Sequence, residues 1–330
     1  MKFPVLSDWN HRTLRLTLLI AIATLALIEI LLRMTGPRIL REDASERSLT
    51  YSYDAELGWA PKPNSSSTVT TRERTIQVRH NSRGLRDIEL ERDPRPTMLF
   101  LGDSMVWGVD AEADERFTDL LRSRISQYKT VNAGVSGFGT DQEFLWLQRI
   151  WLEFEPTVVV LTFCTYNDRS DNSTNVRYGG NRKPYFATTA DGMLELRGQP
   201  VPKSRQLYFK EDWLVRHSWL ARFVITAYVE IRHRQVQVPD RTELLVGKIR
   251  DFVEARGARL MMGLQSNDDQ LVRHLKAERI PFVIFDGAEV YSGSSGAHWT
   301  PSGHRLVADR LMKLLAENNI VEAARSSAAP

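Results

Sequence analysis

Short apolar runs alternate with longer amphipathic stretches through the last two thirds of the chain. Five runs are apolar, of strand length and bounded by turn residues: 97–102, 130–135, 157–163, 258–264 and 281–285. Five other stretches have the hydrophobic spacing of helices: 114–128, 140–153, 241–256, 267–278 and 301–317. Strands that alternate with helices form a parallel sheet covered on both faces. The pattern therefore predicts an α/β protein, a three-layer α/β/α sandwich.

A different pattern stands near the N-terminus, where residues 16–32 are apolar except for two threonines and Glu29. A helix of this length spans about 25 Å, slightly less than the ~30 Å hydrocarbon core of a bilayer. Arg15 and Arg33 flank the run and can reach the interface with their long side chains. A buried core helix also fits the apolar run, but basic residues on both flanks favour a membrane span.

A signal peptide would end in a small-residue cleavage site, and Gly36-Pro37-Arg38 is a poor one. We therefore predict that residues 1–35 are a cytoplasmic tail and an uncleaved anchor, which crosses the cytoplasmic (inner) membrane once through residues 16–32. The basic flanks are nearly balanced, so the positive-inside rule does not choose an orientation. Because the large domain follows the anchor, we place that domain outside the cytoplasm.

Three segments lie outside the strand and helix alternation. Residues 36–96 are polar and proline-marked but contain apolar side chains to bury (Trp59, Ile76, Val78 and Leu85), which predicts an extended arm that packs on the domain. The alternation of the 97–317 domain is interrupted at 169–240. We expect an insertion over one edge of the sheet, with a hairpin around Asp191-Gly192 and a helix over 212–234. Residues 318–330 are predicted to be a flexible tail.

Composition excludes several classes of function. The 330 residues are 42% hydrophobic and 26% charged, which is ordinary for a protein with a substantial core. The net charge of +3 comes without a dense basic block, so we expect no nucleic-acid partner. Cys164 is the only cysteine, which excludes an internal disulfide and a cysteine-based zinc site. No motif in the sequence indicates a metal ion or another cofactor.

Chemically useful residues follow the predicted strands. Ser104 comes directly after the first strand, the glycine-rich "NAGVSGFG" after the second, Asn167 after the third, and His298 shortly before the last helix. In an open parallel sheet, ligands bind beyond the carboxyl ends of the strands, so these residues would face one crevice. A serine, backbone donors, an amide and a histidine are the parts of an acyl-transfer site.

These four blocks, in this order, resemble those of the SGNH hydrolases, also called GDSL-like hydrolases. The resemblance covers roughly residues 95–317 without the insertion, and it implies a flavodoxin-like fold. By this resemblance Ser104 in "LGDSMVWG" is the nucleophile and His298 in "HWTPSGH" is the base. Gly137 in "NAGVSGFG" and Asn167 in "TYND" would complete the oxyanion hole with the backbone N–H of Ser104. The implied reaction proceeds through an acyl-Ser104 intermediate.

Some assignments have competitors within the sequence. Gly134 and Gly139 compete with Gly137 as the backbone donor, and His304 competes with His298, although His304 falls inside the predicted last helix. The family pattern has an aspartate three residues before the histidine, where this chain has Ser295. Either Ser295 or a backbone carbonyl orients the imidazole, or another acid does so, with Asp286 as the candidate.

Val106 stands where the nucleophile elbow of an α/β-hydrolase has its second glycine, which disfavours that fold. We therefore expect a serine esterase, if water accepts the acyl group, or an O-acyltransferase, if a sugar hydroxyl does. The resemblance favours a carbohydrate ester of the cell envelope as substrate. The alternative is a non-catalytic envelope carbohydrate-binding or assembly protein with a degenerate site, which the missing aspartate favours. The acyl group, the acceptor and the oligomeric state do not follow from the sequence.

Overall fold

The computed structural model describes residues 11–42, 50–178, 180–293 and 297–322. They form two compact units. Unit 1 combines the N-terminal segment up to Asp43 with Ser204–Arg234, and unit 2 contains Ala44–Lys203 and Gln235–Pro330. The predicted insertion 169–240 is therefore divided, because its middle part packs with the N-terminal helix. The predicted tail lies outside the described residues from 323 onwards.

A five-stranded parallel sheet forms the centre of unit 2. Its strands are β5 (Thr97–Gly102), β6 (Lys129–Asn132), β7 (Pro156–Phe163), β12 (Arg259–Leu264) and β13 (Phe282–Ile284). They are ordered β13-β12-β7-β5-β6, and all neighbours are parallel. The first strand thus lies between the second and the third, the order of flavodoxin-like sheets, so the chain reverses its winding between β5 and β7. Ligands bind at that switch point in such sheets.

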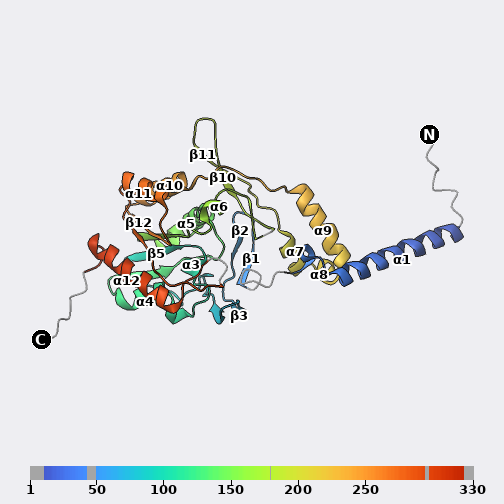
Figure 1. The fold of residues 1–330 in the computed structure, drawn as a ribbon, viewed down its shortest axis with the longest axis horizontal. Coiled ribbons are helices and arrows are strands. Elements are labelled where there is room, and N and C mark those ends of the chain that lie inside the picture. Colours follow the sequence, from blue (N-terminus) through green and yellow to red (C-terminus); the bar gives the residue numbers. More distant parts are fainter. Residues whose placement is uncertain (1–10, 43–49, 179, 294–296, 323–330) are drawn as a thin grey trace. The chain divides into compact units, whose positions relative to one another are not determined.

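Helices cover both faces of this sheet, as the hydrophobic pattern predicts. Met98 and Phe100 of β5 pack on the same side as α4 (Phe117–Arg124) and α12 (Pro301–Glu317). Leu99 and Leu101 point to the opposite side, which α5 (Thr140–Phe154), α10 (Thr242–Glu254) and α11 (Asp269–Ala277) cover. Figure 1 shows α4 with α12 on one side of the sheet and α10 with α11 on the other. The fold is a three-layer α/β/α sandwich.

The region before the sheet forms two antiparallel hairpins. The first pairs β1 (Tyr51–Asp54) with β2 (Gly58–Pro61), and the second pairs β3 (Ser66–Thr70) with β4 (Thr75–Arg79). The apolar residues expected to anchor this arm are buried: Trp59, Ile76, Val78 and Leu85. The β3–β4 hairpin packs on Trp107 and Val109, directly after Ser104. The arm therefore builds one wall of the region at the end of β5.

Buried Arg86 ties the arm to the same region. Its guanidinium donates to the carbonyl oxygens of Trp107 (3.1 Å), Gly108 and Ala111 (2.7 Å), and it lies over the Trp107 ring. Burial, with nearby Arg116, lowers the pKa of Arg86 to about 9. The guanidinium therefore stays charged at neutral pH. Its hydrogen bonds to the three carbonyl oxygens fix the loop that follows Ser104.

Between β7 and α10 the chain forms a short helix, two small hairpins and the helices of unit 1. The helix is α6 (Asp168–Asp171) and the first hairpin pairs β8 (Val176–Arg177) with β9 (Asn181–Arg182). The second pairs β10 (Tyr185–Thr188) with β11 (Leu194–Arg197) around Asp191-Gly192, as predicted.

Unit 1 is helical. It contains α1 (His11–Thr35), a short 3-10 turn η2 (Arg38–Leu40), α7 (Arg205–Glu211), α8 (Trp213–His217) and α9 (Trp219–Arg232). The single helix predicted over 212–234 is wrong. The helix is interrupted at Ser218, whose hydroxyl accepts from Ala221 N at 3.1 Å and caps a second helix. Among the described residues, α1 alone is long and apolar enough to cross a membrane, with mean hydropathy 2.3.

Candidate active site

Ser104 lies at the turn from β5 into the short helix α3 (Ser104–Trp107). Asp103 caps this helix by accepting from Met105 N at 2.9 Å. Gly102 is required before it, because a Cβ there would lie 2.4 Å from a methyl group of Val106. The turn therefore acts as a helix cap and also presents the Ser104 hydroxyl at the carboxyl edge of the sheet.

The structure places His298 next to this hydroxyl. His298 Nε2 lies 2.9 Å from Ser104 Oγ, although the two residues are 194 positions apart. Ser104 Oγ also lies 3.2 Å from a carboxylate oxygen of Asp103. Both His298 and Ser104 are largely buried, so their interaction is shielded from bulk water. This distance is that of a hydroxyl nucleophile with its base.

The competing histidine has a structural role. His304 is buried inside α12, stacks on Phe117, and accepts from Phe117 N at 3.3 Å. Burial, with nearby Arg116 and Arg86, lowers the pKa of His304 to about 3. It is a neutral packing residue at physiological pH.

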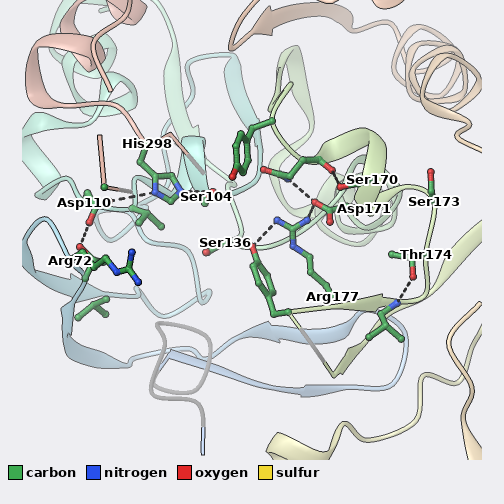
Figure 2. Close-up of a pocket in the computed structure, with 18 of the residues that line it drawn as sticks. Arg72, Ser104, Asp110, Ser136, Ser170, Asp171, Ser173, Thr174, Arg177 and His298 are labelled. Atoms are coloured by element: carbon green, nitrogen blue, oxygen red, sulfur yellow. Dashed lines mark hydrogen bonds and ion pairs between the residues drawn. The ribbon is translucent and has the colours of Figure 1, made fainter. Parts of the chain in front are cut away.

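The carboxylate next to His298 is one that the sequence analysis did not consider. Asp110 Oδ2 lies 3.5 Å from His298 Nδ1, on the opposite side of the ring from Ser104 (Figure 2). Asp110 is 1% exposed. Of the two predicted orienting residues, Asp286 is exposed in the turn after β13 and is not the carboxylate that pairs with His298, and Ser295 lies outside the described residues.

Asp110 is held by the arm and by an unusual backbone. Its φ of 63° is left-handed, and Gly108 two residues earlier has φ 86° and ends α3. Thr71, in the turn of the β3–β4 hairpin, donates its hydroxyl to the Asp110 carboxylate, and Arg74 donates to the Asp110 carbonyl at 3.2 Å. The hairpin turn thus fixes the carboxylate, which explains why sequence spacing alone did not identify it.

The glycine-rich loop after β6 has one free backbone donor among the described residues. Gly134 N donates to Asn132 Oδ1 at 3.0 Å and Gly139 N to Gln142 Oε1 at 3.4 Å, so both are used internally. Gly137 has φ 84° within a turn closed by Phe138 N and Val135 O at 3.1 Å. Its positive φ favours glycine, and its N–H has no acceptor in the described part of the protein.

Asn167 lies in the wall of the same cavity. Its amide nitrogen donates to Asp171 at 2.7 Å and to Asp168 at 3.1 Å, while its oxygen lies 2.9 Å from Cys164 Sγ. Asp171 also forms an ion pair with buried Arg177. The amide is therefore oriented by acidic partners, and donation to a ligand requires it to release one of them.

Four acidic residues that interact electrostatically are buried near these loops: Asp103, Asp141, Glu143 and Asp168. Burial and repulsion from Asp168 raise the pKa of Glu143 well above its ordinary value. Burial and Asp103 do the same to Asp168. Lys183, itself fully buried, forms an ion pair with Asp141. Such a cluster is compatible with folding because some members stay protonated and others are paired.

The cavity above Ser104 has a volume of about 940 Å³. Its lining is rich in hydroxyl, amide and guanidinium groups: Thr70, Thr71, Arg72, Ser136, Tyr166, Ser170, Ser173, Thr174, Arg177, Tyr178 and Gln237. Figure 2 shows Ser104, His298 and Asp110 on one side of it and Ser170, Asp171 and Arg177 on the other. In the described residues no group of three or more His, Cys, Asp or Glu side chains is arranged to hold a metal ion.

The fold is similar to that of several solved esterase structures. A psychrotrophic esterase EstA from Pseudoalteromonas sp. is 11% identical, with a TM-score of 0.40 over 68% of this chain and 98% of that one. A GDSL-like lipase from Bacteroides thetaiotaomicron is 12% identical, with a TM-score of 0.38 over 67% and 88%. A two-domain esterase active on acetylated mannans is 14% identical, with a TM-score of 0.40 over 72% of this chain and 52% of its own. No protein-family model and no curated protein matches the chain.

Proposed function

We propose that this protein is a serine esterase or O-acyltransferase that acts through an acyl-Ser104 intermediate. The observation that carries the proposal is the 2.9 Å approach of His298 Nε2 to Ser104 Oγ at the edge of the polar cavity. The hydroxyl lies at the switch point of the sheet, where a ligand has access to it. If this turn served only to cap α3, no histidine would be needed beside the Ser104 hydroxyl.

The reaction follows from this geometry in two steps. His298 Nε2 takes the proton of the Ser104 hydroxyl while Oγ attacks the ester carbonyl carbon. The tetrahedral intermediate collapses, the C–O bond to the alcohol breaks, and His298 returns the proton to that alcohol. Water or a second hydroxyl then attacks the acyl-Ser104 ester with His298 again as base, the bond between the acyl carbon and Ser104 Oγ breaks, and His298 returns the proton to Oγ. Water gives a free acid, and a sugar hydroxyl gives a new ester.

The negative oxygen of the intermediate needs fixed donors. We assign this role to the backbone N–H groups of Ser104 and Gly137 and to the amide of Asn167. Support comes from the unused N–H of Gly137 and from the position of Asn167 in the cavity wall. Asn167 would exchange its bond to Asp168 or Asp171 for one to the oxyanion. Each such donor typically contributes a few kcal/mol of barrier reduction.

We propose Asp110 as the third member of the site. Its carboxylate lies within ion-pair distance of His298 Nδ1 and is buried, so it can fix the tautomer that leaves Nε2 free to accept a proton. The alternative of a non-catalytic binding protein rested on a missing carboxylate. Asp110 supplies one, and the enzymatic reading is therefore preferred.

The lining of the cavity favours a polar substrate. Hydroxyl and amide groups on several loops can bond to sugar hydroxyls, and Tyr166 offers an exposed aromatic ring beside them. We therefore propose a carbohydrate ester, with the cell envelope as its source.

We further propose that α1 anchors the protein in the cytoplasmic membrane with unit 2 outside the cytoplasm. The helix has 25 residues, about 37 Å, which is sufficient for a bilayer core, and none of its residues is buried in the protein. Protease added to spheroplasts should digest unit 2. Full protection of unit 2 in intact spheroplasts, with digestion only after lysis, would reverse the orientation.

A fluorophosphonate probe tests the nucleophile without knowledge of the substrate. Wild type should be labelled at Ser104, whereas Ser104→Ala should lose the label and His298→Ala should lose most of it. Ser136→Ala is the matched control, because Ser136 lines the same cavity but lies away from His298. Equal labelling of wild type and Ser104→Ala would overturn the proposal.

Acetylated polysaccharides then distinguish the two reactions. Release of free acetate indicates a hydrolase, and appearance of the acetyl group on an added oligosaccharide indicates a transferase. Aryl acetates serve as a reference substrate that needs no sugar contacts. If aryl acetates and carbohydrate esters react equally slowly while the probe still labels Ser104, the substrate class is wrong and the nucleophile stands.

A further inference from the structure

The exposed face of α9 is apolar, whereas Arg222 and Thr226 are buried on its other side together with Val229. Its exposed side chains are Phe223, Val224, Tyr228, Ile231 and Arg232, of which the last position alone is charged. At 100° per residue, the four apolar positions fall within about 140° of one another. In α8, which packs against α9, the large apolar side chains of Trp213 and Leu214 are exposed as well.

The buried side of α9 is held by polar contacts. Arg222 is largely buried and donates to three carbonyl oxygens, those of Val215 (3.0 Å), Leu40 (3.1 Å) and Arg216 (3.0 Å). Its guanidinium also lies over the ring of Phe209. These contacts fix the rotation of α9 about its axis. The apolar side chains are therefore held in their exposed positions.

Glu29 connects this helix to α1. Its carboxylate accepts from the backbone of Trp219 (3.0 Å) and Leu220 (2.7 Å) and from the hydroxyl of Ser218 (2.9 Å), and it pairs with Arg33. Glu29 thereby satisfies the free N–H groups at the start of α9. A carboxylate in an otherwise apolar span is costly unless it is paired, and α9 supplies the pairing.

The contact with Glu29 determines at which level along the axis of α1 the start of α9 lies. Glu29 lies six residues before the end of α1, about 9 Å along the helix axis. If α1 spans the bilayer, this position is near the boundary between hydrocarbon and headgroups. Aromatic and basic side chains are enriched at that level, and Ser204–Arg234 carries six basic and three acidic residues with Trp213, Trp219 and Tyr228 among its aromatics.

We propose that α8 and α9 form an interfacial membrane element, whose apolar face lies in the bilayer surface beside the end of α1. The occupant of this face is lipid. The inference rests on the proposed anchor and adds a second attachment to it. Burial of four to six large apolar side chains favours the interface, and the basic excess adds attraction to anionic lipid.

Spin labels on the full-length protein in vesicles test this. Single cysteines replace Ile231 on the proposed face, Arg232 at its edge, Leu25 in α1 and Leu152 on unit 2, which are all exposed. Wild type, with buried Cys164, gives the background. The vesicles contain phosphatidylcholine and phosphatidylglycerol, and each label is relaxed by oxygen, which concentrates in lipid, or by a water-soluble nickel chelate.

We expect the label at 231 to be several-fold more accessible to oxygen relative to nickel than the labels at 232 and 152. If the label at position 25 lies in lipid while the label at 231 has the same accessibility to oxygen and nickel as the label at 152, the proposed interfacial element is wrong and the anchor stands. If 25 is in water, both are wrong. If 152 is as lipid-exposed as 231, contact with lipid is not specific to this face and the inference falls.

Discussion

Ser104, Asp110 and His298 meet because loops from distant parts of the chain end at one edge of the sheet. Ser104 and Asp110 come from the same loop after β5, and His298 precedes α12. The order of motifs along the sequence was enough to propose the serine and the histidine, since each lies within a recognisable motif. Asp110 could not be found in that way. Its position depends on a left-handed backbone and on a hydroxyl from a hairpin 39 residues earlier.

Asp110→Asn should lower kcat about 10²-fold to 10⁴-fold with little change in KM, because an amide cannot stabilise the imidazolium or fix its tautomer. The assay is hydrolysis of an aryl acetate. Asp286→Asn and Ser295→Ala are the controls and should keep wild-type rates. If Ser295→Ala causes the loss and Asp110→Asn does not, Ser295 is the orienting residue.

His304 should make the protein sensitive to acid. Its folded pKa of about 3 lies below the ordinary value of 6.5, so its stabilising neutral state is fully present above pH 6.5 and is lost as pH falls towards 3. In that window the unfolded chain binds one proton more, which costs roughly 1.4 kcal/mol per pH unit. His304→Gln keeps an acceptor for Phe117 N and removes the titration.

Urea unfolding of both proteins at pH 7, 6, 5 and 4 measures this. As the pH is lowered, the free energy of unfolding should fall less steeply in His304→Gln than in wild type. The two slopes should differ by the uptake of about one proton, roughly 1.4 kcal/mol per pH unit, whatever the two free energies are at pH 7. Parallel curves for the two proteins would contradict the assignment of His304 as a neutral buried residue.

At the level of elements, the hydrophobic period was sufficient for the sheet and its covering helices. Each observed strand lies within the predicted range or extends it by one residue, because buried parallel strands leave a clear apolar signal. The break between α8 and α9 was missed. Apolar residues continue across Ser218, and the carboxylate that favours a helix start there belongs to Glu29, 189 residues away. No local pattern contains that contact.

The arm should affect catalysis through one hydroxyl. Thr71→Val keeps the shape of the side chain but removes the donor to the Asp110 carboxylate. We expect kcat to fall about 10-fold to 100-fold, since a loosened carboxylate orients His298 less well. Thr70→Val is the matched control, because Thr70 lines the same cavity and its hydroxyl bonds only to Thr75 among the described residues. Equal losses in both variants would mean that the hairpin has only a structural role.

Glu29 should determine how firmly α9 is held against α1. In Glu29→Ala the N–H groups of Trp219 and Leu220 lose their acceptor, so the two helices should sample many arrangements. Pulsed electron paramagnetic resonance between labels at 25 and 231 reports this as a broad distance distribution. Ile28→Ala should keep the narrow distribution of the wild-type pair. A narrow distribution in Glu29→Ala would show that apolar packing alone holds α9.

At the scale of the whole molecule, the chain passes between two units three times. All residues proposed for the chemistry and all residues lining the cavity belong to unit 2. The sequence predicted an anchor followed by a domain, because it treats residues near in sequence as near in space. It could not show that Ser204–Arg234 belongs to the unit that contains α1. That division changes which truncation we expect to yield a soluble protein with the complete site.

Removal of residues 1–43 alone should give a poorly soluble protein. It deletes α1, which α9 contacts, and leaves the exposed apolar side chains of α8 and α9 in water. Replacing Ser204–Arg234 with a flexible glycine-serine linker in the same protein should restore solubility, because unit 2 keeps its own core and the complete site. The doubly changed protein should be monodisperse in size-exclusion chromatography and react with the fluorophosphonate probe at the wild-type rate. If the simple truncation is already monodisperse and fully labelled, the apolar face is of no consequence in water. If the doubly changed protein is soluble but unlabelled, unit 2 needs unit 1 to hold its site.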